Sequence, residues 1–188
     1  MKGMVFTQLI EMADTMLGPD QVEAIIAKAD LPSGGAYTAV GNYPHSEAVT
    51  LVGAFSEASG VPVPALLEGF GEHMLRFFHS NYPAFFSTCP DAFTFLESVE
   101  TYVHVEVKKL YPDAELPRFS TYRMGPGRLR FDYYSSRHLE NLAAGLIKGT
   151  LKLYNEYAVV THDSIEGEHG PCVRFLIDKT TSSIQPSA

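Results

Sequence analysis

Apolar side chains recur at helical spacing through the first two-thirds of the chain. The first such run covers residues 2–17, and Gly18-Pro19 ends it, because proline and glycine disfavour continuation of a helix. The segment from Leu31 to His45 is rich in glycine and predicts a loop. Further helices are predicted from Pro19 through Ile26, from an N-cap at Ser46 to Ser59, over residues 65–80, and as one long helix over residues 91–110.

The pattern changes in the last third of the chain. Residues 118–124 and 128–134 predict two strands around a turn at residues 125–127, and residues 157–162 and 172–177 predict a second strand pair. A helix over residues 138–153 separates the pairs. We therefore expect an α+β fold, with a helical N-terminal lobe packed on a second lobe that holds a small antiparallel sheet and a crossing helix. No repeat or long linker divides the sequence, so we expect one domain over residues 1–188, with lobes at about 1–63 and 64–188.

Composition narrows the classes of function. The net charge is −8, with 22 acidic and 14 basic side chains, which argues against binding nucleic acid or an anionic membrane surface. No apolar stretch approaches the roughly 20 residues of a membrane helix, and Glu11 and Asp14 interrupt the N-terminal apolar run too early for a signal peptide. With only two cysteines, we expect a cytoplasmic protein of a reducing compartment.

Two features suggest a binding site. His104 lies on the flank of an apolar stripe in the predicted long helix, formed by Leu96, Val99, Val103, Val107 and Leu110. At the end of the second strand, Tyr133, Ser135 and Arg137 form a Y-x-S-x-R pattern that alternation would place on one side of an extended segment. Two hydroxyl donors and a guanidinium group suit a pair of carboxylates such as the propionates of heme. Taken singly, each feature also fits an ordinary core histidine or a solvated strand edge.

Together with Pro117 in LYPDAELPRF, the MKGMVF opening and the GLIKG stretch, these residues give the whole chain a resemblance to the heme–nitric oxide/oxygen binding (H-NOX) family. The resemblance is to bacterial stand-alone H-NOX proteins, related to the heme domain of soluble guanylate cyclase. It implies that heme b lies between the lobes, with His104 as the proximal iron ligand. It further implies that Pro117 distorts the macrocycle and that Tyr133, Ser135 and Arg137 bind the propionates.

The same resemblance indicates which gas is sensed. O2-binding members carry a distal tyrosine five residues beyond the arginine of the Y-x-S-x-R motif, and here that position is Leu142. The other positions matching the distal wall also lack a hydrogen-bond donor: Val5, Leu9, Met74, Phe78 and Leu146. Bound O2 needs a donor and NO does not, so we expect NO, and also CO, to bind and O2 not to bind stably. From sequence alone these six residues equally fit a packed core.

The resemblance implies signalling by contact. NO would break the bond between His104 and iron, and the freed helix would change how the protein acts on a separate histidine kinase or cyclic-di-GMP enzyme. We expect no enzymatic activity, because no nucleophile–base motif or phosphate loop occurs.

Two alternatives stay open. One is an apolar-ligand module without heme. The other is a zinc or thiol redox sensor built from His138, His162, His169 and Cys172, although Glu140 and Ile165 stand where further cysteines would be needed. His73 and His79 are expected at the surface, and Cys89 as a buried small residue.

Overall fold

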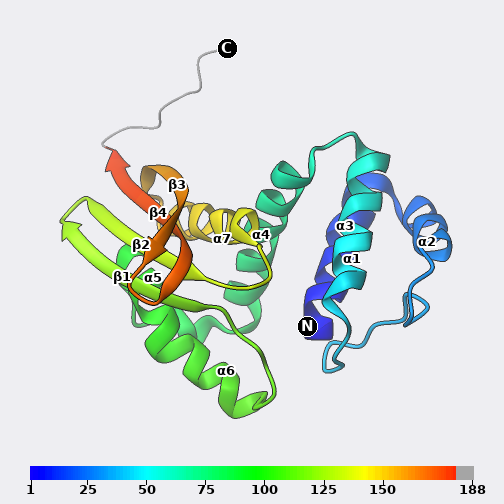
Figure 1. The fold of residues 1–188 in the computed structure, drawn as a ribbon, viewed down its shortest axis with the longest axis horizontal. Coiled ribbons are helices and arrows are strands. Elements are labelled where there is room, and N and C mark those ends of the chain that lie inside the picture. Colours follow the sequence, from blue (N-terminus) through cyan, green and yellow to red (C-terminus); the bar gives the residue numbers. More distant parts are fainter. Residues whose placement is uncertain (181–188) are drawn as a thin grey trace.

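The computed structural model describes residues 1–180, so the last eight residues of the expected domain lie outside the described part. Three helices gather on one side of the molecule: α1 (Gly3–Leu17), α2 (Pro19–Lys28) and α3 (His45–Ser59) (Figure 1). We call α1–α3 and the loop between α2 and α3 the helical lobe. The fourth helix, α4 (Val63–Asn81), leads from it to the rest of the chain, which we call the sheet lobe. Helix α3 begins one residue before the predicted N-cap at Ser46, because Pro44 takes the N-cap position.

The predicted long helix over residues 91–110 is broken. After a short 3₁₀ turn (Pro83–Phe85), the chain forms α5 (Ala92–Ser98), a π-helical turn (Val99–Val103) and α6 (His104–Leu110). Asp91 caps the start of α5, where its carboxylate accepts a hydrogen bond from the Thr94 backbone N–H at 2.7 Å. The extra residue per turn in the π-helix rotates the apolar stripe, so Leu96 is buried whereas Leu110 is 65% exposed.

Four antiparallel strands form one sheet in the order β1-β2-β4-β3, with β1 at Arg118–Gly125, β2 at Arg128–Tyr134, β3 at Tyr157–Gly167 and β4 at Gly170–Thr180. The second hairpin is longer than predicted, because β3 and β4 pair up to Gly167 and Gly170. Gly170 has a φ of 100°, which glycine adopts without strain, so the reversal needs no long loop. Helix α7 (Glu140–Leu153) crosses the sheet, and the α+β prediction is confirmed.

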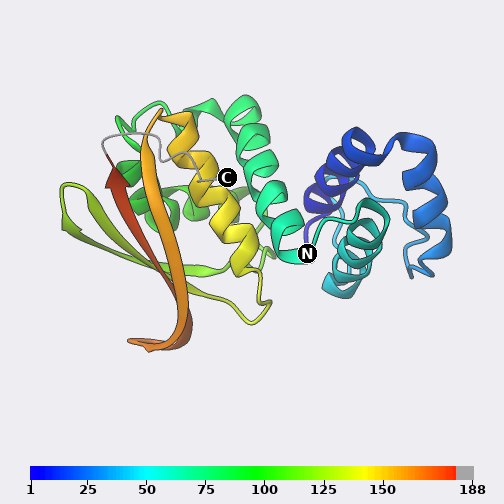
Figure 2. The same ribbon diagram turned by 90° about the horizontal axis from the view of Figure 1, so that it is seen from above.

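Helices α4 and α7 run side by side between the sheet and the helical lobe (Figure 2). Their backbones touch at two glycines. A Cβ on Gly71 would lie 2.3 Å from the Leu142 carbonyl oxygen, and one on Gly145 would lie 2.0 Å from the Glu68 carbonyl oxygen. This close approach needs glycine on both helices, and it fixes which side chains of α7 face α4.

The core has separate parts in the two lobes. One cluster joins α1, α2 and α3 to the first half of α4, and its fully buried members include Phe6, Leu51 and Phe55. A second lies between the sheet, α5 and α7, around Phe93 and Phe175. Within residues 1–180, no single helix has the length and apolar composition of a membrane span, although α3 and α4 meet both criteria as a pair bent by 109°.

Candidate functional site

His104 is the first residue of α6, directly after the π-helical turn. Its side chain is only 15% exposed, and its ring packs against Phe119 of β1 with 5.2 Å between ring centroids. Its Nδ1 lies 3.3 Å from Oε2 of Glu100, and the same carboxylate oxygen accepts a hydrogen bond from the Phe119 backbone N–H at 3.1 Å. Glu100 therefore ties the imidazole to the edge of the sheet.

The protonation of His104 follows from these contacts. Burial lowers the pKa of the imidazole, and the nearby Glu100 carboxylate opposes that effect. A neutral ring that donates its Nδ1–H to Glu100 keeps the lone pair on Nε2, which is the form that ligates a metal. A carboxylate behind a ligating histidine also fixes the tautomer and the ring orientation.

Sequence reasoning missed Glu100. The residue precedes His104 by four positions, a spacing that brings two side chains together on a helix face, and that signal could have identified it. Pro117, which the resemblance assigned to heme distortion, is half-buried and directly precedes β1, two residues before Phe119.

The Y-x-S-x-R residues come together, but not by strand alternation. Strand β2 ends at Tyr134, so Ser135 and Arg137 belong to the turn that follows, and the predicted extended segment is wrong. The turn forms because the Ser135 hydroxyl accepts a hydrogen bond from the Arg137 backbone N–H at 3.1 Å. Tyr133 is buried, and burial raises the pKa of its hydroxyl, which is hydrogen-bonded to Ser135. Two hydroxyls and a guanidinium group thus share one turn.

Arg137 is an accessible cation at this turn. Its guanidinium donates to the Glu115 carboxylate at 2.5 Å and to the Glu115 backbone carbonyl at 3.2 Å. The Glu115 side chain is 84% exposed, so the ion pair is solvated and contributes little to stability. A buried carboxylate that approached Arg137 would therefore compete with a weak partner.

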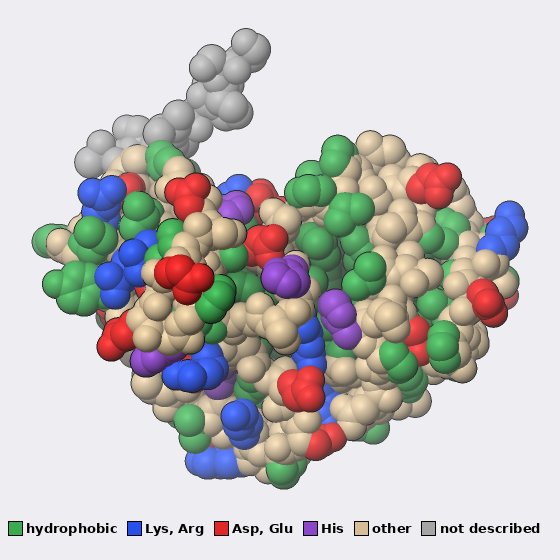
Figure 3. Space-filling model, in the orientation of Figure 1, with side chains coloured by type: hydrophobic (Ala, Val, Ile, Leu, Met, Phe, Trp, Pro, Cys, Tyr) green, Lys and Arg blue, Asp and Glu red, His purple; other side chains and the backbone are tan. Residues whose placement is uncertain are grey.

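All six residues expected in the distal wall belong to one apolar cluster at the junction of α1, α4 and α7. Leu9 and Met74 are buried, and the other four pack against the buried residues: Val5, Phe78, Leu142 and Leu146. The contact between α4 and α7 brings Leu142 and Leu146 to this junction. Figure 3 shows that the surface is hollowed where the two lobes meet, with hydrophobic and histidine side chains along the hollow.

A chain of polar groups borders this wall. Gln8, beside Leu9 on α1, is buried, and its carbonyl oxygen accepts a hydrogen bond from His73 Nε2 of α4 at 2.9 Å. The Gln8 amide nitrogen donates to Glu11 at 2.8 Å. His73 is therefore a half-buried link between the lobes, and its expected place at the surface is wrong; His79 is exposed as expected.

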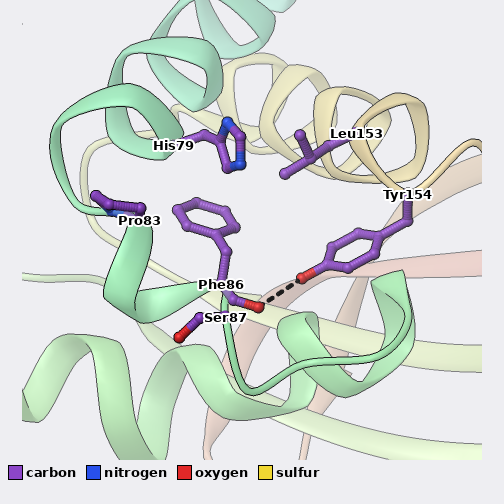
Figure 4. A pocket seen from close by; sticks show the side chains of 6 residues that line it. All are labelled: His79, Pro83, Phe86, Ser87, Leu153 and Tyr154. Atoms are coloured by element: carbon purple, nitrogen blue, oxygen red, sulfur yellow. Dashed lines mark hydrogen bonds between the residues drawn. The ribbon is translucent and has the colours of Figure 1, made fainter.

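Two open pockets lie along the outer ends of α4 and α7. One of about 310 Å³ is lined by His79, Pro83, Phe86, Ser87, Leu153 and Tyr154, with the Tyr154 hydroxyl donating to the Phe86 carbonyl at 3.4 Å (Figure 4). The other, of about 390 Å³, shares His79 and Leu153 with it. Neither is lined by a residue that the sequence assigned to heme.

The residues considered for zinc do not form a site. His162 packs on Phe175 and His169 on Tyr134, while Cys172 pairs in register with Ile165. Among the described residues, no three histidine, cysteine, aspartate or glutamate side chains come close enough to hold a metal ion. Cys89 is buried, as expected.

The sequence matches the family described as haem-NO-binding over residues 2–162. An Fe(II) unliganded H-NOX protein from K. algicida is similar in structure, with a TM-score of 0.88 and 34% identity, covering 98% of this chain and 100% of that chain. An H-NOX protein from S. oneidensis in the Fe(II)NO ligation state gives a TM-score of 0.86 at 21% identity, covering 96% of this chain and 100% of that chain. No curated protein sequence matches this chain. The family match and the 34% identical relative show that the chain belongs to the haem-NO-binding, or H-NOX, family.

Proposed function

We propose that this chain is a nitric oxide sensor of the H-NOX type, with His104 as the proximal ligand of a b-type heme. H-NOX domains are heme-based gas-sensing modules, and solved structures of the family contain iron in the ferrous state. The residues present fit that cofactor. A neutral imidazole, an apolar wall and a turn with two hydroxyls and a guanidinium group match the iron, the faces and the propionates of heme. When bound, the heme supplies the ferrous iron to which the gas binds.

Each residue of the proposed site has a distinct task. His104 holds the iron through Nε2 while Glu100 fixes the other ring nitrogen. The propionates are bound by Tyr133, Ser135 and Arg137. To bind a propionate, Arg137 gives up its ion pair with the exposed Glu115. Pro117, next to the strand that packs on His104, presses on the macrocycle.

The apolar character of the distal wall is the observation that supports NO, and not O2, as the gas that is sensed. The six side chains at the junction of α1, α4 and α7 are aliphatic, thioether or phenyl groups. Gln8 is the buried polar residue on α1, but His73 and Glu11 already occupy its amide. Bound O2, which carries negative charge and needs a donor, is left unstabilised, whereas NO and CO do not need one.

Release of His104 provides the signal. His104 would hold α6 to the iron, and NO binding would release α6 from that bond. The loop after α6 is tied to the helical lobe through Asp113, which accepts hydrogen bonds from Lys2 at 2.9 Å and from Asn42 at 2.6 Å. A shift of α6 is therefore transmitted directly to the helical lobe. The lobes would pack against each other in two ways, and binding of NO would change the population of each.

The output acts on another protein through the surface of α6 and the lobe junction. This chain shows no catalytic motif, so we assign it no enzymatic activity of its own. A histidine kinase or a cyclic-di-GMP enzyme is the proposed effector. The position of Leu110, which is 65% exposed at the end of α6, supports a contact there.

The test is spectroscopic. The purified protein should show a Soret band, and the ferrous form should hold one histidine. After saturation with NO, electron paramagnetic resonance and resonance Raman spectra should show no histidine bound to iron. A histidine still bound would contradict the signalling mechanism, and a stable O2 complex in air would contradict selectivity for NO. A protein that takes up no added heme would leave an apolar-ligand module as the better account.

A further inference from the structure

A polar atom without a partner lies where the two lobes meet. Nε2 of His45, the first residue of α3, is inaccessible to solvent and has no hydrogen-bond partner within the described chain. A buried polar nitrogen left unpaired is unfavourable, and such atoms are uncommon in folded proteins unless something else binds them. Six side-chain atoms of the described residues are of this kind, and Nε2 of His45 is thus available to a ligand.

Two cationic groups lie beside His45. The backbones of Met1 and Tyr43 exchange hydrogen bonds of 2.8 and 2.9 Å, which places the N-terminal amine two residues from His45. Arg137, in the turn after β2, is close enough for its charge to act on both His45 and the N-terminal amine. Burial lowers the pKa of His45 most, and the charges of Arg137 and of the amine lower it further.

Three acidic groups of the described chain lie nearby. Glu47, in the first turn of α3, accepts hydrogen bonds from the Ser33 and Tyr37 hydroxyls through Oε2, while its Oε1 is buried without a partner among the described residues. Glu115 pairs with Arg137 at its exposed side, and Asp113 binds Lys2 and Asn42. Glu115 and Asp113 raise the pKa of the N-terminal amine, whereas the shift in the pKa of His45 has other causes. Helix α3 adds to the positive potential, because its N-terminus lies at His45 and no side chain of the described residues caps it. An imidazole nitrogen, a guanidinium group, an amine and a helix N-terminus favour an anion with two acceptor oxygens.

We propose that His45 Nε2 donates a hydrogen bond to the heme propionate that Arg137 binds, so that one carboxylate joins the helical lobe to the sheet lobe. The inference rests on the proposed function, because it takes the carboxylate from heme. It adds a residue of the helical lobe to a propionate site that otherwise belongs to the turn after β2. The carboxylate satisfies the buried nitrogen and offsets the two positive charges around it.

The first test measures heme retention. His45→Leu removes the donor at similar bulk, His45→Gln keeps an N–H donor, and Ser46→Ala is a control at the exposed neighbour. Transfer of heme from the holoprotein to an excess of apomyoglobin should be several-fold faster for His45→Leu than for the wild type, and near the wild-type rate for His45→Gln and Ser46→Ala. A wild-type rate in His45→Leu would overturn the proposal.

The second test uses the unaltered protein and so does not depend on how a variant folds. The CO-loaded ferrous holoprotein is diamagnetic, and nuclear magnetic resonance can follow the His45 ring through a pH titration. A carboxylate on Nε2 stabilises the protonated ring, so the pKa of His45 should be higher with heme than in protein reconstituted with heme dimethyl ester, whose propionates carry no charge. An equal pKa with the two cofactors means that no carboxylate is bound there, and the proposal fails while heme binding stands. If the wild type takes up no heme, the proposed function fails first, and this inference fails with it.

Discussion

Nδ1 of His104 lies 3.3 Å from Oε2 of Glu100, one helical turn earlier, and that carboxylate also accepts the Phe119 backbone N–H. The contact couples the proposed iron ligand to both the π-helical turn and β1. Glu100→Gln removes the negative charge and keeps the side chain's size. We expect a weaker bond between His104 and iron, because a carboxylate partner makes the imidazole a stronger ligand.

The iron–histidine stretching frequency in the resonance Raman spectrum of the ferrous protein measures this effect, and it should fall in Glu100→Gln. Glu106→Gln is the matched control on the same helix, since Glu106 pairs with Lys109 rather than with His104. Loss of a residue that is hydrogen-bonded to a metal-ligating histidine typically lowers the affinity for the metal about 10- to 100-fold. An unchanged frequency would show that Glu100 only holds the backbone of β1.

His104→Gly should remove the proximal ligand and leave space for a free imidazole. Heme should bind weakly to this variant, and added imidazole should restore a histidine-like ferrous spectrum. Absorption and resonance Raman spectra with and without imidazole make the comparison. Spectra identical to those of the wild type without imidazole would exclude His104 as the ligand.

Arg137→Ala should retain heme less well, because a propionate loses a charge-assisted partner. Such hydrogen bonds contribute about 1.5–3 kcal/mol, which corresponds to heme loss about ten- to a hundredfold faster. Glu115→Gln is the informative control. It removes the exposed group that competes for Arg137, so heme should be retained as well as in the wild type or better. Equal rates of heme loss in Arg137→Ala and the wild type would count against the propionate role.

Leu142→Tyr should slow O2 dissociation from the ferrous protein, because the phenol adds a donor to the apolar wall. Leu142 belongs to the cluster at the junction of α1, α4 and α7, whereas Leu153, on the same helix, lines the open outer pocket. Leu153→Tyr should therefore leave O2 binding unchanged. Flash photolysis and stopped-flow mixing give the rates, and an effect of equal size in both variants would mean that the distal wall lies elsewhere.

The fold could be predicted because its signals are local, and the same local patterns selected the residues of the candidate site. The period of the apolar residues identified most of the helices and strands. The Y-x-S-x-R pattern brought Tyr133, Ser135 and Arg137 together, although they meet at a turn and not along an extended segment. The break at Val99–Val103 could not be read in the same way, because a π-helical turn keeps an almost helical pattern of apolar residues. The close approach of Gly71 and Gly145 depends on two helices far apart in sequence.

Polar partners were the least predictable part. His73 looked like a surface residue because it follows the expected spacing of an exposed position, but Gln8 of another helix buries and binds it. The environment of His45 likewise depends on Met1 and Arg137, which are far apart in the sequence. Glu100 is the exception, since its spacing from His104 was visible in the sequence.

The last prediction concerns the effector. If release of His104 is the signal, His104→Gly should act on the partner as the NO-bound protein does, without NO. The loop after α6 is joined to the helical lobe through Asp113 and Lys2, so Asp113→Asn should weaken the transmission while leaving heme binding intact. The assay is phosphorylation by a candidate histidine kinase, or turnover of cyclic-di-GMP, at matched concentrations of the ferrous, NO-bound and His104→Gly forms. The NO-bound and His104→Gly forms should have the same effect, and the ferrous form a different one. Equal effects of all three would mean that the heme site is not coupled to output, and storage of gas or heme would then explain the protein better.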